Sequence, residues 1–178
     1  MPKSPPLNLI GKPLALQDLK DLLKTAVEEP NTVRKGEKFE VFFGNFMAQQ
    51  EGFVFLRLHT RSRVGEIDYF YRSEHRDHPL FQKFPYLFIE CKNWHDPVSS
   101  EKMNHFIRLM QAKSLFSCCG IYITTSYFSP EALTAVRDAR MKDGTMVILV
   151  DNRELNMMME KGFKVFIQEK CDEIMAKA

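Results

Sequence analysis

The second half of the chain alternates short apolar runs with amphipathic stretches of helical length. The apolar runs "YLFIEC", "GIYITTS" and "TMVILVD" are typical of buried strands. Between them, residues 99–116 and the segment "SPEALTAVRDARMKDG" favour helices; the second has a serine cap, a proline at its first position and a closing glycine. Strand–helix–strand connections of this kind are right-handed and join parallel strands. The pattern predicts an α/β fold with an at least partly parallel sheet.

The first half supplies helices and further strands. One apolar stripe predicts a helix that ends before Pro30, and a second helix should run from about Val33 to Gln50, closed by Gly52. Its buried stripe is Phe39, Phe42, Phe43, Phe46 and Met47. Strands are expected at Phe53–Leu58 and Glu66–Tyr71, followed by a polar loop up to the third strand, Tyr86–Cys91.

The expected domain organisation is one compact domain with a short addition. Residues 1–30 form an N-terminal extension with one helix, and residues 31–178 form the domain; residues 152–162 favour a short helix, and the tail after them could be a strand or a helix. At 178 residues, with 44% hydrophobic and 27% charged content, the chain resembles an ordinary globular protein. The longest apolar runs are too short to cross a bilayer, so we expect no membrane association.

Cysteine usage and the N-terminus indicate the compartment. The four cysteines form no CxxC pair, and adjacent Cys118 and Cys119 are poorly placed to share one metal ion. The N-terminus lacks the apolar region and cleavage site of a secretory signal. We therefore expect reduced thiols in a cytoplasmic protein, without a zinc site.

Two of the predicted strands carry charged residues where a buried strand should be apolar. On the second strand, alternation separates two sets of side chains: Glu66, Asp68 and Phe70 against Ile67, Tyr69 and Tyr71. On the third strand it separates two more: Phe88, Glu90 and Lys92 against Leu87, Ile89 and Cys91. If the two strands pair, Asp68 and Glu90 point into the same space.

Two carboxylates held together repel each other, and burial adds a cost of several kcal/mol unless a cation lies between them. A divalent metal ion would satisfy both Asp68 and Glu90, and Lys92 adds a further positive charge. Carboxylate oxygens and water suit Mg²⁺, which can polarise a phosphoryl oxygen and acidify a bound water. The arrangement favours phosphodiester hydrolysis, with a coincidental ion pair as the alternative.

The motifs resemble those of a known superfamily. "GEID" on one strand and "ECK" on the next are similar to the signature of the PD-(D/E)xK nucleases. The segments "GEKFEVFFGNFMAQQEGF", "GIYITTSYFSPEA" and "VILVDNREL" resemble the Mrr-type restriction endonuclease branch, over residues 34–156. The resemblance implies a restriction-endonuclease-like core of helix, three strands, helix and strand, with a central mixed sheet flanked by helices. The chain departs from the branch in having Glu90 where glutamine is frequent.

The resemblance also implies roles for individual residues. Asp68 and Glu90 would be metal ligands, and Lys92 would be the catalytic lysine. The backbone carbonyl of Cys91 would complete the inner shell, and Glu40 would help to hold the metal directly or through water. The metal would be Mg²⁺, with Mn²⁺ as a substitute. Two polar residues would lie further out: Glu66 beside Asp68, and Gln111 on the helix after the third strand.

A basic run suggests where a nucleic acid could bind. In "RLHTRSR", Arg57, Arg61 and Arg63 share one face of an extended chain, which could equally be a solvated edge strand. Lys102 and Arg108 are further candidates for phosphate contacts. Double-stranded DNA is the favoured partner. The chain has no phosphate-binding GxxxxGK[ST] loop, so motor activity would belong to another polypeptide. Nothing in it resembles a base-reading element, so specificity would belong to another domain, a partner or a dimer, and a homodimer is compatible with the pattern.

Together these features predict a metal-dependent DNA endonuclease, acting in restriction or defence against foreign DNA as the resemblance implies. Two alternatives remain. One is a structure-selective resolvase of the Holliday-junction type. The other is an inactive nuclease fold that serves as a DNA-binding or assembly module.

Overall fold

Five strands form one mixed sheet in chain order. In the computed structural model, which describes residues 13–62, 65–112 and 118–177, the strands are β1 (Phe53–Ser62), β2 (Gly65–Ser73), β3 (Tyr86–Lys92), β4 (Cys118–Thr124) and β5 (Met146–Val150). The β1–β2 and β2–β3 pairs are antiparallel, whereas β3–β4 and β4–β5 are parallel. The α/β class and the partly parallel sheet predicted from the sequence are therefore confirmed.

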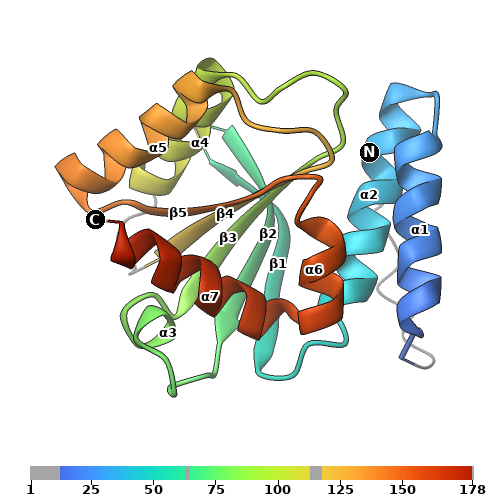
Figure 1. Ribbon diagram of the computed structural model, residues 1–178, viewed down its shortest axis with the longest axis horizontal. Helices are drawn as coiled ribbons and strands as arrows, with labels where there is room; N and C mark the ends of the chain where they lie inside the picture. Colours follow the sequence, from blue (N-terminus) through green and yellow to red (C-terminus); the bar gives the residue numbers. More distant parts are fainter. Residues whose placement is uncertain (1–12, 63–64, 113–117, 178) are drawn as a thin grey trace.

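Helices cover both faces of this sheet (Figure 1). One face carries four helices: α1 (Leu16–Glu28), α2 (Thr32–Met47), α6 (Leu155–Lys161) and α7 (Phe163–Ala176). The other face carries two: α4 (Ser100–Ala112) and α5 (Pro130–Asp143). The short α3 (Pro79–Lys83) precedes β3. This is the helix, three-strand, helix and strand core that the sequence resemblance implied, with the undecided tail folded as α7.

The larger core is built around the aromatic stripe of α2. Phe39, Phe42, Phe43, Phe46 and Met47 are all at most 1% exposed, as the sequence predicted. The rings of Phe43 and Phe46 both contact Phe163 of α7 edge-on. Since each buried aromatic side chain removes a large apolar area from water, this stripe fixes α2 against the sheet.

The helix α2 ends before the predicted boundary. Its last residue is Met47, and the Ala48 N–H donates to the Gly44 carbonyl at 3.0 Å. Gly52, expected to close the helix, lies instead in the turn into β1 with a φ of 74°. A Cβ there would lie 2.6 Å from the His75 ring, so the turn depends on glycine for both its conformation and its space.

The predicted polar loop before β3 contains α3. His78 caps this helix, because its Nδ1 accepts from the Leu80 N–H at 3.1 Å, and Pro79 occupies the first helical position. Leu80 and Phe81 are buried in the larger core. The helix was missed because only these two residues carry its apolar signal.

Strict alternation along β2 fails at one residue. Ile67 was expected beside Tyr69, yet it packs in the smaller core with Phe88 and Phe106, whereas Tyr69 belongs to the larger core. The β2–β3 register begins at Tyr69 opposite Ile89. Because β2 has no β3 partner at Ile67, this end of the strand can turn toward the α4 layer.

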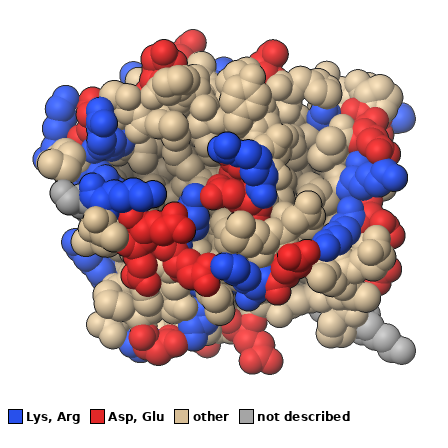
Figure 2. Space-filling view, in the orientation of Figure 1, with Lys and Arg blue, Asp and Glu red and all other residues tan. Residues whose placement is uncertain are grey.

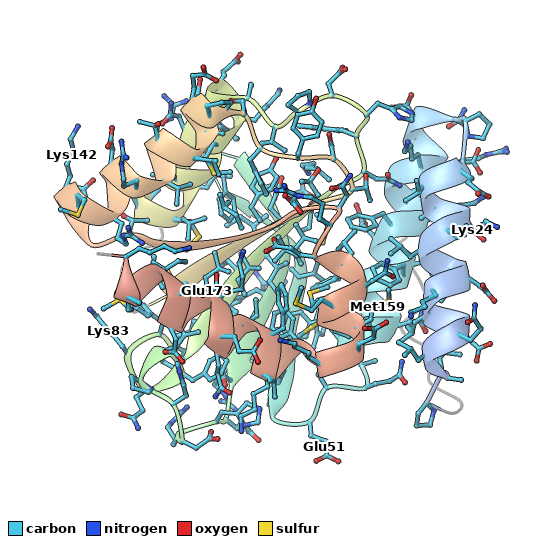
Figure 3. All side chains as sticks on the ribbon, in the orientation of Figure 1. Lys24, Glu51, Lys83, Lys142, Met159 and Glu173 are labelled. Carbon is cyan, nitrogen blue, oxygen red and sulfur yellow. The ribbon has the colours of Figure 1, made fainter. Side chains whose placement is uncertain are left out.

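The outer surface is polar. Lys24 and Glu51 point into solvent, while Met159 of α6 lies against the core (Figure 3). Within the described residues, no helix is long and apolar enough to cross a membrane.

Candidate active site

Three charged side chains meet where β2 and β3 part. The Lys92 ammonium lies 2.7 Å from Glu90 Oε1 and 3.4 Å from Asp68 Oδ2. The two carboxyl side chains are almost buried, at 12% and 10% exposure, while Lys92 is 26% exposed. The structure thus brings together the two carboxylates and the lysine that the strand pattern predicted to lie close to each other. Lys92 is the most exposed of the three.

The backbone explains how Asp68 reaches this position. The Asp68 Oδ2 atom accepts a hydrogen bond from the Cys91 N–H at 2.8 Å. The side chain therefore satisfies a backbone donor of β3 beyond the residues where the β2–β3 ladder is formed. On the other side of β3, the Thr125 N–H donates to the Lys92 carbonyl at 3.1 Å. The end of β3 is held from both sides.

Burial makes the ionised form of Glu90 costly. Burial, and after it the Asp68 carboxylate, raises its pKa from 4.5 to about 7, although Lys92 opposes both. One oxygen, Glu90 Oε2, is buried and has no hydrogen-bond partner. A buried acceptor without a partner is rare in folded proteins, and it marks a position that a ligand could fill.

Lys92 stays charged despite its burial. Desolvation alone would lower its pKa, but Glu90 and then Asp68 outweigh it and hold the pKa above the usual lysine value. Tyr122 lies beside them, opposite Glu90 on β4, and burial followed by the Glu90 charge raises the pKa of its hydroxyl. The site therefore combines two buried carboxylates with one firmly protonated amine.

Glu40 of α2 lies near the same strands. The Tyr69 hydroxyl donates to the Glu40 carbonyl at 2.6 Å, which ties α2 to β2 one residue from Asp68. Burial is the main cause that raises the pKa of the Cys91 thiol, and both Asp68 and Glu40 add to it. The charges of Glu40 and Asp68 therefore act on the same residue of β3.

The donor set fits a hard divalent cation. Mg²⁺ commonly takes one or two protein carboxylates and completes its shell with water and phosphate. Asp68 and Glu90 supply two carboxylates, and Glu90 Oε2 is an oxygen without a partner. No group of three or more His, Cys, Asp or Glu side chains among the described residues is arranged as a metal cage. A cation held here would take the rest of its oxygen ligands from the backbone, water or a phosphate.

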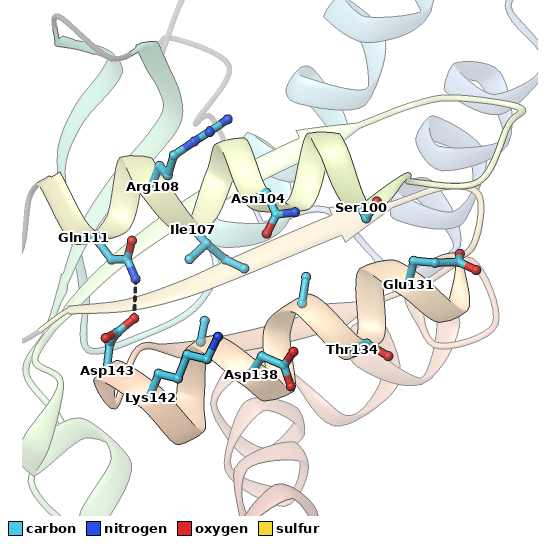
Figure 4. A pocket seen from close by; sticks show the side chains of 12 residues that line it. Ser100, Asn104, Ile107, Arg108, Gln111, Glu131, Thr134, Asp138, Lys142 and Asp143 are labelled. Atoms are coloured by element: carbon cyan, nitrogen blue, oxygen red, sulfur yellow. Dashed lines mark hydrogen bonds between the residues drawn. The ribbon is translucent and has the colours of Figure 1, made fainter.

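The role predicted for Gln111, near the site but outside the metal's inner shell, is wrong. Gln111 does not face this site; its amide donates to Asp143 Oδ2 at 2.9 Å, across the groove between α4 and α5 (Figure 4). This open groove of about 480 Å³ has the buried Ile107 and Ala139 at its base, and most of its other lining side chains are exposed. Glu66 is half-buried on β2, opposite Arg61 in the strand register.

The described basic candidates lie on the α4 side of the sheet. Arg57 is exposed and stands opposite Phe70, whose ring belongs to the α4-side core. Lys102 and Arg108 are exposed on α4, and the Lys102 ammonium lies 5.9 Å from the Trp94 ring centroid. Arg63 and the side chain of Arg61 lie outside the described part. On the opposite side, over α6 and α7, acidic and basic side chains are interspersed (Figure 2).

Sequence reasoning missed a buried lysine near the end of β3. Lys35 of α2 is 4% exposed, and its ammonium contacts His95 Nε2 at 2.9 Å. Its backbone carbonyl accepts from Asn93 Nδ2 at 2.9 Å. The available signal was its spacing, because Lys35 precedes Phe39 by one helical turn on the buried stripe.

A family model matches most of the chain. The Mrr_cat model, described as "Restriction endonuclease", matches residues 34–159. The chain belongs to this restriction endonuclease family. The matched segment contains α2 from its third residue, all five strands and the charged site, and it confirms the Mrr-type resemblance seen in the sequence.

Two solved structures are similar to parts of this chain. The first, "Structure of EndoMS-dsDNA2 complex", has a TM-score of 0.46 and 12% identity over 70% of this chain and 47% of that one. The second is Pyrococcus furiosus SfsA in complex with Ca²⁺, with a TM-score of 0.36 and 10% identity over 67% of this chain and 56% of that one. The chain thus spans about half the length of each. No curated protein sequence matches it.

Proposed function

We propose that this Mrr_cat domain is a metal-dependent endonuclease that hydrolyses phosphodiester bonds of double-stranded DNA. The observation that carries the proposal is the meeting of Asp68, Glu90 and Lys92, with one buried Glu90 oxygen left without a partner. A purely structural ion pair gives no reason for a buried oxygen that lacks a hydrogen bond, because such an atom lowers the stability of the fold. A bound ligand would give that reason.

Each residue has a distinct role in this proposal. Asp68 and Glu90 hold Mg²⁺ or Mn²⁺, with the Cys91 carbonyl and Glu40 as further oxygen donors, Glu40 directly or through water. The metal, when bound, polarises the phosphoryl oxygen and lowers the pKa of a bound water. Lys92 is charged and partly exposed, so its ammonium can stabilise the negative charge that develops on the phosphate. Glu66 supports Asp68 from the same strand.

The exposed side chains Arg57, Lys102 and Arg108 would hold the DNA backbone, together with Arg61 and Arg63. Such contacts position a duplex without selecting its sequence. The family description supports a role in restriction of foreign DNA inside the cell, with specificity supplied by another domain, a subunit or a second copy of the chain.

The test is plasmid nicking combined with metal binding. Supercoiled plasmid is incubated with Mg²⁺ or Mn²⁺ and wild type, Asp68→Asn, Glu90→Gln or Lys92→Met, and metal affinity is measured by calorimetry. Lys170→Met is the matched control, because its ammonium pairs with Glu154 at 2.6 Å and is similarly buried, at 21% exposure. Wild type and Lys170→Met should nick the plasmid, and the three site variants should not.

The metal measurement separates the roles. Asp68→Asn and Glu90→Gln should weaken Mg²⁺ binding, whereas Lys92→Met should abolish cleavage but still bind metal. Cleavage that survives in all three site variants would contradict the assignment of the site. Duplex binding without cleavage under any metal condition would favour the DNA-binding module, and cleavage confined to branched substrates would favour the resolvase.

A further inference from the structure

A buried lysine with an unusual partner lies beside the proposed site. Lys35 is 4% exposed, yet it forms no ion pair with a carboxylate among the described residues. The one hydrogen-bond partner of its ammonium there is His95 Nε2, at 2.9 Å. A buried ammonium is costly unless it is paired, so this contact needs a reason beyond packing.

The contact determines the protonation of His95. If Lys35 is protonated, its ammonium carries three donors and no acceptor, and the Nε2 atom of His95 accepts. An imidazolium has no acceptor, so this contact with an ammonium requires a neutral His95 ring with its one proton on Nδ1. His95 is exposed, and Nδ1 has no hydrogen-bond partner within the described part of the chain. The result is an oriented neutral N–H donor that faces solvent.

The surrounding contacts hold His95 in place. The Ser126 hydroxyl donates to the His95 carbonyl at 3.0 Å. Asn93, buried at 5% exposure, donates to the Lys35 carbonyl at 2.9 Å and accepts from the Thr125 hydroxyl at 2.7 Å. The segment that begins directly after Lys92 is therefore bound to both α2 and the end of β4.

His95 also lies close to the proposed site along two separate elements. It follows Lys92 by three residues, and its partner Lys35 precedes Glu40 by five residues on α2. At the rise of an α-helix, that separation is about 7 Å along the axis. On this proximity in the chain, the loop that begins directly after Lys92 is assigned to the phosphate next to one bound between Glu90 and Lys92.

We infer that His95 binds a phosphate oxygen next to the scissile one through its Nδ1–H, and that Lys35 is the positioning residue that fixes this tautomer. The inference rests on the proposed nuclease function. A neutral donor adds geometric selection without adding charge, so its removal should weaken DNA binding and leave the salt dependence of binding unchanged.

The tautomer is tested first, without DNA. Long-range ¹H–¹⁵N NMR spectra of histidine-labelled protein in EDTA at pH 8 distinguish the five histidines, and His95→Gln assigns the signal of interest. We expect a neutral ring with the proton on Nδ1. In Lys35→Met the Nε2–H form should become populated. A wild-type ring with its proton on Nε2 would overturn the inference, whether or not the Lys35 variant folds.

Binding is tested with labelled duplex DNA in EDTA over a range of salt concentrations, and cleavage with Mg²⁺. His95→Ala should raise both Kd and KM about three- to tenfold, the effect of one hydrogen bond, with kcat nearly unchanged. His95→Gln should restore affinity, because its amide can accept from Lys35 and donate outward. His78→Asn is the control, because it replaces a histidine away from the proposed phosphate contact and keeps an oxygen that can cap α3. Its Kd and KM should equal those of wild type.

Each outcome separates the two proposals. If wild type cleaves DNA and His95→Ala binds equally well, only the role of His95 is overturned. If His95→Ala lowers the slope of log Kd against log salt by about one, the value for one cationic phosphate contact, His95 binds as a cation, and the neutral-donor inference is wrong. If wild type shows the Nδ1–H form but neither binds nor cleaves DNA, the nuclease proposal fails, and the phosphate role fails with it.

Discussion

Replacing Glu90 with glutamine should stabilise the metal-free protein at alkaline pH. Burial raises the pKa of this carboxyl from 4.5 to about 7 in the folded state. The folded protein therefore binds the proton more tightly than the unfolded chain, and stability falls as the pH rises from 4.5 to 7. Glutamine resembles the protonated acid in shape and charge, so Glu90→Gln removes this cost.

The magnitude follows from the difference between the two pKa values. One pKa unit corresponds to about 1.4 kcal/mol, so full ionisation of Glu90 costs the folded state about 3 kcal/mol above pH 7. At pH 5 the same linkage gives less than about 1 kcal/mol, because Glu90 remains protonated in the folded state. The predicted signature is a gain that is large at pH 8.5 and small at pH 5.

Urea unfolding in EDTA at the two pH values measures this gain. With a slope of about 2–3 kcal/mol per M urea, the midpoint of Glu90→Gln should rise by about 1 M at pH 8.5. Glu154→Gln is the control, because Glu154 pairs with Lys170 at 2.6 Å and also accepts from the Asp151 N–H. That substitution removes satisfied contacts, so it should lower stability at both pH values.

Magnesium provides the complementary measurement. A ligand that binds only the folded state at ten times its Kd adds about 1.4 kcal/mol. Mg²⁺ should therefore stabilise wild type at pH 8.5 and have little effect on Glu90→Gln. If Glu90→Gln is less stable than wild type in EDTA at pH 8.5, the carboxylate is a satisfied structural group and the reasoning is refuted.

Three further predictions concern the site and the cores. Lys92→Met leaves two buried carboxylates unopposed, so metal-free protein should lose about 2–3 kcal/mol in urea unfolding at pH 8.5, and Mg²⁺ should restore part of it; equal stability with and without the cation would contradict this. A Cβ at Gly120 would lie 2.8 Å from Phe106, so Gly120→Ala should lower the free energy of unfolding by about 1–3 kcal/mol. A Cβ at Gly36 on α2 would have no atom within 4 Å, so Gly36→Ala should raise that free energy by up to about 1 kcal/mol. A more stable Gly120→Ala than Gly36→Ala would be inconsistent with the packing of α4. Burial raises the pKa of the Cys119 thiol well above 9, so iodoacetamide at pH 8.5 should label it only after unfolding, as mass spectrometry can show.

The sequence predicted the parts of the fold where local pattern and tertiary environment agree. The stripe from Phe39 to Met47 is apolar at helical spacing, and α2 buries it as expected. On β3, alternation correctly separates Phe88 from Ile89, because this strand is paired on both sides. Ile67 is paired with Thr60 of β1 but with no residue of β3; there alternation no longer determines the face, and the prediction failed.

The candidate site was predictable in its centre and less so at its edge. Asp68, Glu90 and Lys92 are close because the register of two adjacent strands brings them together. The direction in which Gln111 points depends instead on the rotation of α4 about its axis. It follows Ile107 by one turn, and both line the groove toward α5 (Figure 4). Lys35 was missed because a charged residue on a buried stripe is invisible to a hydrophobic pattern.

The same geometry decides how the site should be mutated. The Cys91 N–H loses its ladder partner where β2 and β3 part, and Asp68 Oδ2 replaces that partner at 2.8 Å. Asp68→Ala would leave this buried donor unsatisfied at a cost of about 1–3 kcal/mol, so a loss of activity could arise from the displaced end of β3. Asp68→Asn keeps an acceptor oxygen for the Cys91 N–H and removes the charge. If Asp68→Asn folds with wild-type stability and still loses metal binding, the loss must come from the carboxylate charge, since the strand end is intact.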